Sequence, residues 1–278
     1  MRGRWLRLRH RRPLVARGPA ADPVRAVCPA GPAPPPGGAR VSLLQRLPPG
    51  LLDGVDGVVF DLDGTLIDSE KAICAAASLA FGDIGRDVDE AAVADHLGAP
   101  LDELYACFVD DADPARRAHF VARYVHHHDE HPDKNPPALP GVVDGLALLR
   151  ARGLPLAVGT TKPTARATQQ LQACGLLPHF AHVQGTDPPL RPKPAPDVVQ
   201  VACRALGVAP ARALMVGDTA RDVDAARAAG CRAIVVAYGA HRLQVAARLG
   251  ADAVVDSLAL LGATAAAARP RVTSTSTT

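Results

Sequence analysis

The chain has 278 residues, of which 48% are hydrophobic, 21% charged and 3% aromatic. This composition is typical of one or two globular domains and excludes a fibrous repeat and a fully disordered chain. No uncharged apolar run approaches the roughly 18 residues of a membrane-spanning helix. The formal net charge of +3 is unevenly spread, because residues 1–50 hold ten arginines and a single acidic residue, Asp22.

Residues 1–50 form a basic extension rich in proline and glycine, which we expect to be disordered. A dispensable extension is favoured, because charge runs are usually solvated. The alternatives are an arm for nucleic acid or acidic membranes, an organelle-targeting peptide, and translated sequence upstream of the true start. The extension lacks the apolar segment of a secretory signal peptide, so we expect a cytoplasmic protein. The sequence does not predict the oligomeric state. Six cysteines without a Cys-x-x-Cys pair indicate reduced, packed thiols.

From residue 51 the chain repeats an order of helix, glycine and short apolar strand. Glycine tolerates the left-handed conformation that ends a helix, and the pattern recurs at Gly153, Gly175, Gly207, Gly230 and Gly250. The expected strands are continuously apolar, as in sheets covered on both faces: 57–60, 156–158, 213–216, 233–237 and 253–255. The alternation predicts an α/β fold with a doubly wound, Rossmann-like parallel sheet.

Between the first two strands the pattern contains helices only. They are expected at 69–81, 89–97, 101–108 and 115–128, and a proline-rich stretch, 132–140, is the expected return linker. We therefore predict an inserted helical cap domain over 68–138. The catalytic core takes 51–67 and 139–265, and 266–278 is a disordered tail.

The first strand ends at two carboxylates, Asp61 and Asp63, followed by Gly64 and Thr65. Ligands of open α/β sheets bind beyond the carboxyl ends of the strands. One carboxylate at that position can act as a covalent nucleophile, and its neighbour can move protons. An Asp-rich turn without chemistry is the alternative.

Three later motifs meet the same edge of the predicted sheet. Thr160 follows the second strand and is suited to hydrogen-bond phosphate oxygens. Lys193, between two prolines, can neutralise a phosphoryl group or the nucleophile. Asp218 and Asp222 offer hard oxygen ligands for Mg²⁺. Taken singly, these residues have other readings: a solvated loop lysine, a helix cap at Asp218, and pairing of Asp222 with Arg221 or a more distant base.

In this order the four motifs resemble the haloacid dehalogenase-like superfamily of phosphotransferases, over residues 55–262. The resemblance implies that Asp61 forms an aspartyl-phosphate, that Asp63 is the general acid and base, and that Thr160 and Lys193 hold the phosphate. The implied magnesium ligands are Asp61, Asp63, Asp218 and Asp222. The implied substrate-binding residues are Gly64 and Thr161 of the core and His96, Gly98 and Pro100 of the cap.

The cap residues lie in a turn, 96–101, that resembles the substrate-specificity loop of capped relatives. An ordinary turn between two helices is the alternative. Four histidines also fall in the cap: His126, His127, His128 and His131. Consecutive histidines face different ways on a helix, so a solvated cap surface is favoured over a metal site.

Further segments resemble phosphoglycolate phosphatases: 68–69, 160–163, and 237–239 together with 250–257. Thr161 stands where relatives often have asparagine. The predicted function is that of a magnesium-dependent phosphatase for a small phosphorylated metabolite, with 2-phosphoglycolate as the first substrate. The alternatives are a sugar phosphatase, a pyrophosphatase or nucleotidase, and a hexose-phosphate mutase. A non-catalytic binding protein is the remote alternative.

Overall fold

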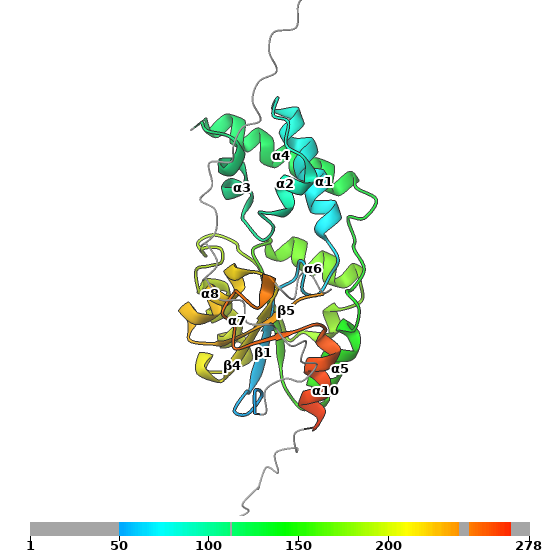
Figure 1. Cartoon of the computed structure of the whole chain (residues 1–278), viewed down its shortest axis with the longest axis vertical. Coiled ribbons are helices and arrows are strands. Elements are labelled where there is room, and N and C mark those ends of the chain that lie inside the picture. The colour runs from blue at the N-terminus through cyan, green and yellow to red at the C-terminus, as the bar shows by residue number, and fades with distance from the viewer. Residues whose placement is uncertain (1–49, 112, 239–244, 268–278) are drawn as a thin grey trace, which may run out of the picture.

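The computed structural model describes residues 50–111, 113–238 and 245–267, with side chains up to residue 263 (Figure 1). The predicted basic extension lies outside the described residues except for Gly50. Of the predicted tail, the first two residues end the last helix, and 268–278 lie outside the described residues. The elements are β1 (Gly57–Phe60), α1 (Glu70–Asp83), α2 (Glu90–Ala94), α3 (Leu101–Phe108), α4 (Pro114–Glu130), α5 (Val142–Ala151), β2 (Leu156–Gly159), α6 (Thr164–Ala173), η1 (Leu177–His179), β3 (His182–Gln184), α7 (Asp197–Leu206), η2 (Pro210–Arg212), β4 (Ala213–Gly217), α8 (Ala220–Ala229), β5 (Arg232–Val236), β6 (Ala253–Val255) and α10 (Leu258–Ala267).

The strands form one parallel sheet in the order β3-β2-β1-β4-β5-β6, with β1 inside it. The predicted α/β class with a doubly wound parallel sheet is confirmed. Strand β3 was not predicted from the sequence. It has three residues, of which His182 and Gln184 are polar and all are half-buried at the sheet edge, so it lacks the apolar run that marks the other strands.

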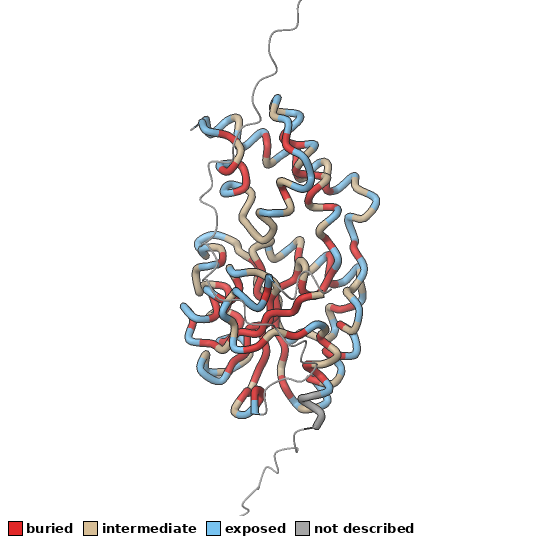
Figure 2. The backbone as a smooth tube through the Cα atoms, in the orientation of Figure 1, coloured by how far each residue is buried: buried red, intermediate tan, exposed pale blue. Residues whose placement is uncertain are grey.

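Alternate residues of the strands enter two separate cores. On β1, Val58 and Phe60 pack into a cluster with α5, α6 and α10, whereas Val59 packs with α7 and α8 on the other face. The strands are accordingly the most continuously buried part of the molecule (Figure 2). Because both faces are covered, ligands reach the sheet only at the ends of its strands.

Two of the predicted helix-ending glycines show why glycine marks the ends of helices in this sequence. Gly207 and Gly230 end α7 and α8 with φ values of 69° and 83°, in the left-handed region. A side chain at that φ is strained, so glycine marks the turn from helix to strand.

Helices α1 to α4 form a separate layer beyond the sheet (Figure 1). Their shared core includes Phe81 and Phe120, whose ring centroids are 4.5 Å apart. The chain enters and leaves this layer along neighbouring paths, since Ile67 pairs with Ala138 in a β-bridge and the Leu139 amide donates to the Leu66 carbonyl at 2.9 Å. The helical layer is therefore an insertion with its own apolar interior.

Among the described residues, no helix combines the length and the apolar character needed to cross a membrane. The described cysteines Cys74, Cys174, Cys203 and Cys231 are free thiols, as expected.

Helices α5 and α10 pack closely at two glycines. A Cβ atom at Gly145 would lie 2.4 Å from the Leu258 carbonyl oxygen, and one at Gly262 would lie 2.9 Å from the Gly145 Cα. Backbone atoms cannot yield to such an approach as a flexible side chain can. The closeness of the two helices therefore requires the absence of a side chain at both positions.

We expect Gly145→Ala to lower the free energy of unfolding by about 1–3 kcal/mol, because the added methyl group forces α5 away from α10. Urea denaturation measures the change. Gly82→Ala in α1 is the matched control, since a Cβ atom there meets nothing within 4 Å. The control should keep or slightly raise the stability. An unchanged stability of Gly145→Ala would mean that the two helices repack freely.

Candidate active site

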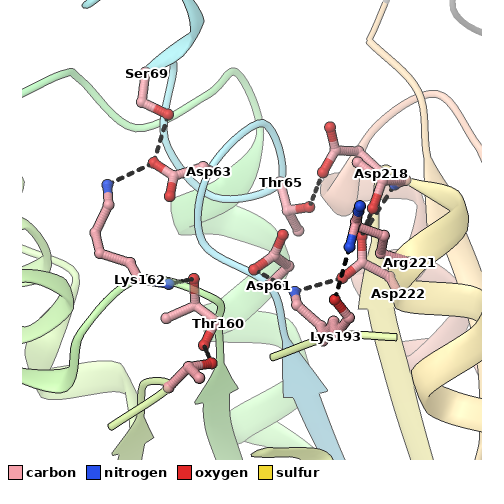
Figure 3. Close-up of polar contacts among 12 residues, drawn as sticks. Asp61, Asp63, Thr65, Ser69, Thr160, Lys162, Lys193, Asp218, Arg221 and Asp222 are labelled. Atoms are coloured by element: carbon pink, nitrogen blue, oxygen red, sulfur yellow. Dashed lines mark hydrogen bonds and ion pairs between the residues drawn. The ribbon is translucent and has the colours of Figure 1, made fainter. Parts of the chain in front are cut away.

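The carboxyl ends of β1, β2 and β4 bring three of the sequence motifs to one edge of the sheet. In register, Phe60 of β1 lies beside Val158 of β2 and Val216 of β4. Asp61 directly follows β1 and Thr160 directly follows the neighbouring strand β2, and the Asp61 amide donates to the Val216 carbonyl at 2.8 Å. Figure 3 shows their side chains together above the strand ends.

Lys193 lies at the centre of this group and is only 1% exposed. Its Nζ is 2.7 Å from Asp61 Oδ1 and 2.5 Å from Asp222 Oδ1. A charge this deeply buried is tolerated only when it is paired. Burial alone lowers the pKa of Lys193, but the two carboxylates outweigh it and hold the pKa above its ordinary value. Lys193 therefore carries a full positive charge between two acids.

Burial raises the pKa of Asp61 to about 7, against the attraction of Lys193 and with a further contribution from Asp222. The pKa of Asp218 is also well above its ordinary value, because of burial and because Asp222 and Asp61 are near. The Thr65 hydroxyl donates to Asp218 Oδ1 at 3.0 Å. Carboxylates crowded in this way repel one another unless a cation joins them.

Oxygen atoms of Asp61, Asp218 and Asp222 lie within 4.8 Å of one another. Carboxylate oxygens are the ligands that Mg²⁺ prefers, and a set of few protein ligands is typical of this ion. The residues present therefore fit a magnesium ion. The carboxylate of Asp63, which was expected among the ligands, lies outside this cluster and contacts other groups, and its role as a ligand stays a prediction.

Two glycines make room for this cluster. A Cβ atom at Gly64, which has a φ of 74°, would lie 2.3 Å from Asp218 Oδ2. A Cβ atom at Gly217 would lie 2.2 Å from Asp222 Cγ. The close approach of the carboxylates thus depends on these two residues having no side chain.

Asp222 has two structural partners besides its place in the cluster. Its Oδ2 accepts hydrogen bonds from the Thr219 amide at 3.0 Å and the Thr219 hydroxyl at 2.7 Å, at the start of α8. Its Oδ1 pairs with Lys193. From the sequence, Arg221 was one possible partner of Asp222. In the structure Arg221 donates instead to the Lys193 carbonyl and to Glu103. Asp222 therefore fixes both the helix start and the buried lysine.

Asp63 is held by two donors. Its Oδ1 accepts from the Ser69 hydroxyl at 2.6 Å and from Lys162 Nζ at 2.7 Å (Figure 3). Burial acts to raise its pKa, but Lys162 and the Ser69 hydrogen bond outweigh burial and hold the pKa below its ordinary value. Lys162 also donates to Gln170 Oε1 at 2.5 Å. The surroundings of Asp63 and Asp61 thus shift their pKa values in opposite directions, although the two residues are only two positions apart.

A cavity of about 250 Å³ lies between this edge of the sheet and the helical layer. Its core lining includes the predicted residues Asp61, Asp63, Gly64, Thr161 and Asp218, and its cap lining includes His96, Gly98 and Pro100. Thr160, Lys193 and Asp222 are almost fully buried and are not among the lining residues of the described chain. The predicted residues are therefore brought together from both layers, some at the cavity surface and some behind it.

Polar contacts close the helical layer over the cavity. At Gly98, whose φ is 83°, a Cβ atom would lie 3.3 Å from the Thr219 side chain. Arg221 Nη2 is 2.5 Å from Glu103 Oε2 of α3. On another side, Arg166 of α6 pairs with Asp129 of α4. The loop from His96 to Pro100 is thereby placed against the core.

Residues 58–236 match the family described as Haloacid dehalogenase-like hydrolase. The chain is 37% identical over 220 residues to the phosphoglycolate phosphatase of Chromobacterium violaceum, covering 76% of this chain and 96% of that one. It is 35% identical over 211 residues to the phosphoglycolate phosphatase of Thiobacillus denitrificans, covering 74% of this chain and 93% of that one. The chain belongs to the haloacid dehalogenase-like hydrolases. Within that family it is a phosphoric monoester hydrolase of the phosphoglycolate phosphatase-like branch.

Solved structures agree with the fold of this hydrolase. A predicted phosphoglycolate phosphatase from Haemophilus somnus matches with a TM-score of 0.67 and 27% identity, over 75% of this chain and 96% of that one. CbbY from Rhodobacter sphaeroides, solved in complex with xylulose-(1,5)bisphosphate, matches with a TM-score of 0.60 and 26% identity, over 74% of this chain and 95% of that one. The matches cover the sheet and the inserted helices together.

The histidines of the cap differ from the expectation of a solvated surface. His128 is buried, and its Nδ1 lies 3.3 Å from Arg166 Nη1. His127 is half-buried and contacts Asp83 at 2.7 Å. The prediction was wrong for His128 because α4 turns this residue toward the core, which the sequence of four neighbouring histidines did not reveal.

Other residues of the site also escaped the sequence analysis. They are Ser69, Lys162, Arg166 and Glu103, the last of which pairs with Arg221. Lys162 stood within a quoted motif without a role, and Ser69 stood within another. Arg166 and Glu103 gave no local signal, since each is one charged residue on a helix.

We expect this hydrolase to lose stability through His128 as the pH falls from 6.5 toward 4. Burial, Lys162 and Arg166 lower the pKa of His128 from 6.5 to about 4, outweighing Asp63 and Asp129. In that interval the unfolded chain takes up a proton that the folded chain does not. The loss should be about 2 kcal/mol by pH 4.5.

Urea denaturation of the wild-type chain and His128→Phe at pH 7.5 and 4.5 measures this contribution. The variant should lose less stability between the two pH values than the wild-type chain. His126→Phe, at an exposed position of the same helix, should behave as the wild-type chain. Equal losses in all three proteins would contradict the assignment.

Proposed function

We propose that this hydrolase is a magnesium-dependent phosphatase that hydrolyses a small phosphomonoester through an aspartyl-phosphate on Asp61. The observation that carries the proposal is the buried Asp61 carboxylate at the cavity, 2.7 Å from the Lys193 ammonium. A carboxylate beside a fixed cation can approach an anionic phosphoryl group, because the cation offsets their repulsion. The relatives named phosphoglycolate phosphatases support the same reaction class.

In the first step, an Asp61 oxygen attacks phosphorus, forming an O–P bond while the ester P–O bond breaks. Asp63 gives a proton to the departing oxygen. In the second step, Asp63 takes a proton from water, and the water oxygen displaces Asp61 to release phosphate. The contacts of Asp63 with Lys162 and Ser69 favour its carboxylate form, which is the form that the second step requires.

Asp61 and Asp218 would hold Mg²⁺, with Asp222 beside them. When bound, this ion supplies positive charge next to the phosphoryl oxygens. Lys193 contributes a second positive charge from within the protein. Asp222 keeps that charge in place because it is paired with Lys193 and anchored at the start of α8.

We propose 2-phosphoglycolate as the first substrate to test. The relatives in Chromobacterium violaceum and Thiobacillus denitrificans carry the name of this activity. A cavity of about 250 Å³ under the helical layer suits a small metabolite better than a polymer. A screen of phosphorylated metabolites, including sugar phosphates, pyrophosphate and nucleotides, tests this choice. A higher kcat/KM for one of those classes would replace it.

We expect Asp61→Asn to lower turnover about 10⁴-fold, because the amide keeps the shape of the side chain and loses the attacking charge. Release of phosphate from 2-phosphoglycolate measures the effect. Asp68→Asn is the matched control, since Asp68 is exposed on the same loop. Near-normal turnover of Asp61→Asn, in a preparation free of wild-type enzyme, would contradict the nucleophile.

Removal of divalent metal should abolish turnover reversibly, since few carboxylates hold the ion. Activity should vanish in excess EDTA and return with Mg²⁺. Calcium should inhibit, because its bonds of about 2.3–2.6 Å are longer than those of Mg²⁺ and its coordination is looser. Full activity in EDTA, with absence of metal verified by elemental analysis, would refute the magnesium requirement.

A further inference from the structure

A buried amide on α6 is hydrogen-bonded at both of its polar atoms. Gln170 is 6% exposed, its Oε1 accepts from Lys162 Nζ at 2.5 Å, and its Nε2 donates to the Lys134 carbonyl at 3.1 Å. An ammonium group can only donate and a carbonyl oxygen can only accept, so one orientation of the amide satisfies both partners. A buried polar group whose bonds are all made holds its neighbours in place. Gln170 therefore fixes the position of the Lys162 ammonium.

Lys162 depends on Gln170 for one of its two side-chain acceptors. The other is Asp63 Oδ1, at 2.7 Å, and the Lys162 side chain is 10% exposed at the cavity. Loss of the Gln170 amide would leave an N–H of the ammonium without an acceptor in the interior, which is costly. The long lysine side chain has many rotamers and can turn toward water instead. Gln170 thus keeps Lys162 on Asp63.

Both donors to Asp63 bind the same oxygen. The Ser69 hydroxyl donates to Asp63 Oδ1 at 2.6 Å, and Figure 3 shows Ser69 and Lys162 meeting at this atom. No described residue donates to the other oxygen, Oδ2. Each carboxyl oxygen offers about two lone-pair sites, so two donors occupy those of Oδ1. In the proposed reaction, the proton that Asp63 transfers is therefore carried on Oδ2.

This network reaches both connections between the sheet and the helical layer. Ser69 lies directly before α1, where the chain enters the layer, and Lys134 lies between α4 and α5, where the chain returns. Asp63 is held directly by the first connection. It is held by the second through Lys162 and Gln170.

We propose that Gln170 is a positioning residue that keeps Lys162 on Asp63 Oδ1 and thereby presents Asp63 Oδ2 to the departing oxygen. The inference rests on the proposed phosphatase function. When the ester P–O bond breaks, its electron pair goes to the departing oxygen, the Oδ2 proton moves to that oxygen, and Asp63 becomes a carboxylate. Gln170 is not among the described residues that line the cavity, so it acts on this step through Lys162.

The test compares two phosphate esters that differ by one methylene group. p-Nitrophenyl phosphate releases a stable phenolate, whereas p-nitrobenzyl phosphate releases an alkoxide that needs a proton. The ratio kcat/KM covers the steps up to release of the alcohol, and so reports the first proton transfer. We expect Gln170→Met to lower kcat/KM about tenfold or more for the benzyl ester and less than about twofold for the phenyl ester. Gln172→Met, at an exposed position of the same helix, is the matched control and should change neither value.

A second substitution, Lys162→Met, tests whether Gln170 acts through Lys162. If it does, Gln170→Met has no further effect on the benzyl ester once Lys162 is replaced. Effects of the two substitutions that multiply would mean that Gln170 acts by another route, and would overturn the inference. Where Gln170→Met does not fold, Gln170→Asn takes its place, because the shorter amide cannot reach both partners.

Equal losses on the two esters, or no loss on either, would overturn the positioning role and leave the proposed function standing. Where the wild-type enzyme hydrolyses neither ester, crystal structures of the wild-type chain and Gln170→Met decide the placement. Lys162 Nζ should leave Asp63 Oδ1 in the variant, and an unchanged position would overturn the inference. The proposed function fails separately, if 2-phosphoglycolate and the other phosphorylated metabolites are not hydrolysed either.

Discussion

The buried ion pair between Lys193 and two carboxylates is the constraint on which the site depends. Asp61 follows β1, Lys193 precedes α7 and Asp222 lies in α8, yet Lys193 Nζ is 2.7 Å from Asp61 Oδ1 and 2.5 Å from Asp222 Oδ1. Removing Lys193 leaves two carboxylates without their cation in the interior, at a cost of several kcal/mol. The loops at this edge of the sheet are therefore held in one arrangement, which is also the arrangement that the proposed attack by Asp61 requires.

The crowding of like charges at the site has a cost in stability. Asp218 and Asp222 approach because Gly64 and Gly217 have no side chains to separate them from the neighbouring turns. Their mutual repulsion raises the pKa of Asp218, with burial as the larger cause. A divalent cation would convert this repulsion into attraction. In the proposed mechanism, relief of this repulsion would contribute to the affinity of the site for Mg²⁺.

The helical layer is joined to the core by contacts of a different kind. Glu103 with Arg221 and Asp129 with Arg166 are partly exposed pairs, and such pairs contribute about 0–1 kcal/mol each. Weak polar contacts suit a layer that has to admit a substrate and then exclude water. Its interior, by contrast, is a continuous apolar cluster around Phe81 and Phe120, so the layer has a core of its own.

The sequence by itself determined the α/β class, the strands β1, β2, β4, β5 and β6, the inserted helices and the motif residues at the strand ends. These follow from local signals: apolar runs, glycines at helix ends, and carboxylates directly after strands. Only the tertiary structure decided that Lys162 contacts Asp63, 99 positions away, and that His128 is buried beside Arg166. It also decided the edge strand β3, whose hydrogen bonds with β2 compensate for its polar residues. Such features depend on which distant surfaces pack together, and a charged residue looks the same in sequence whether its partner is water or another element.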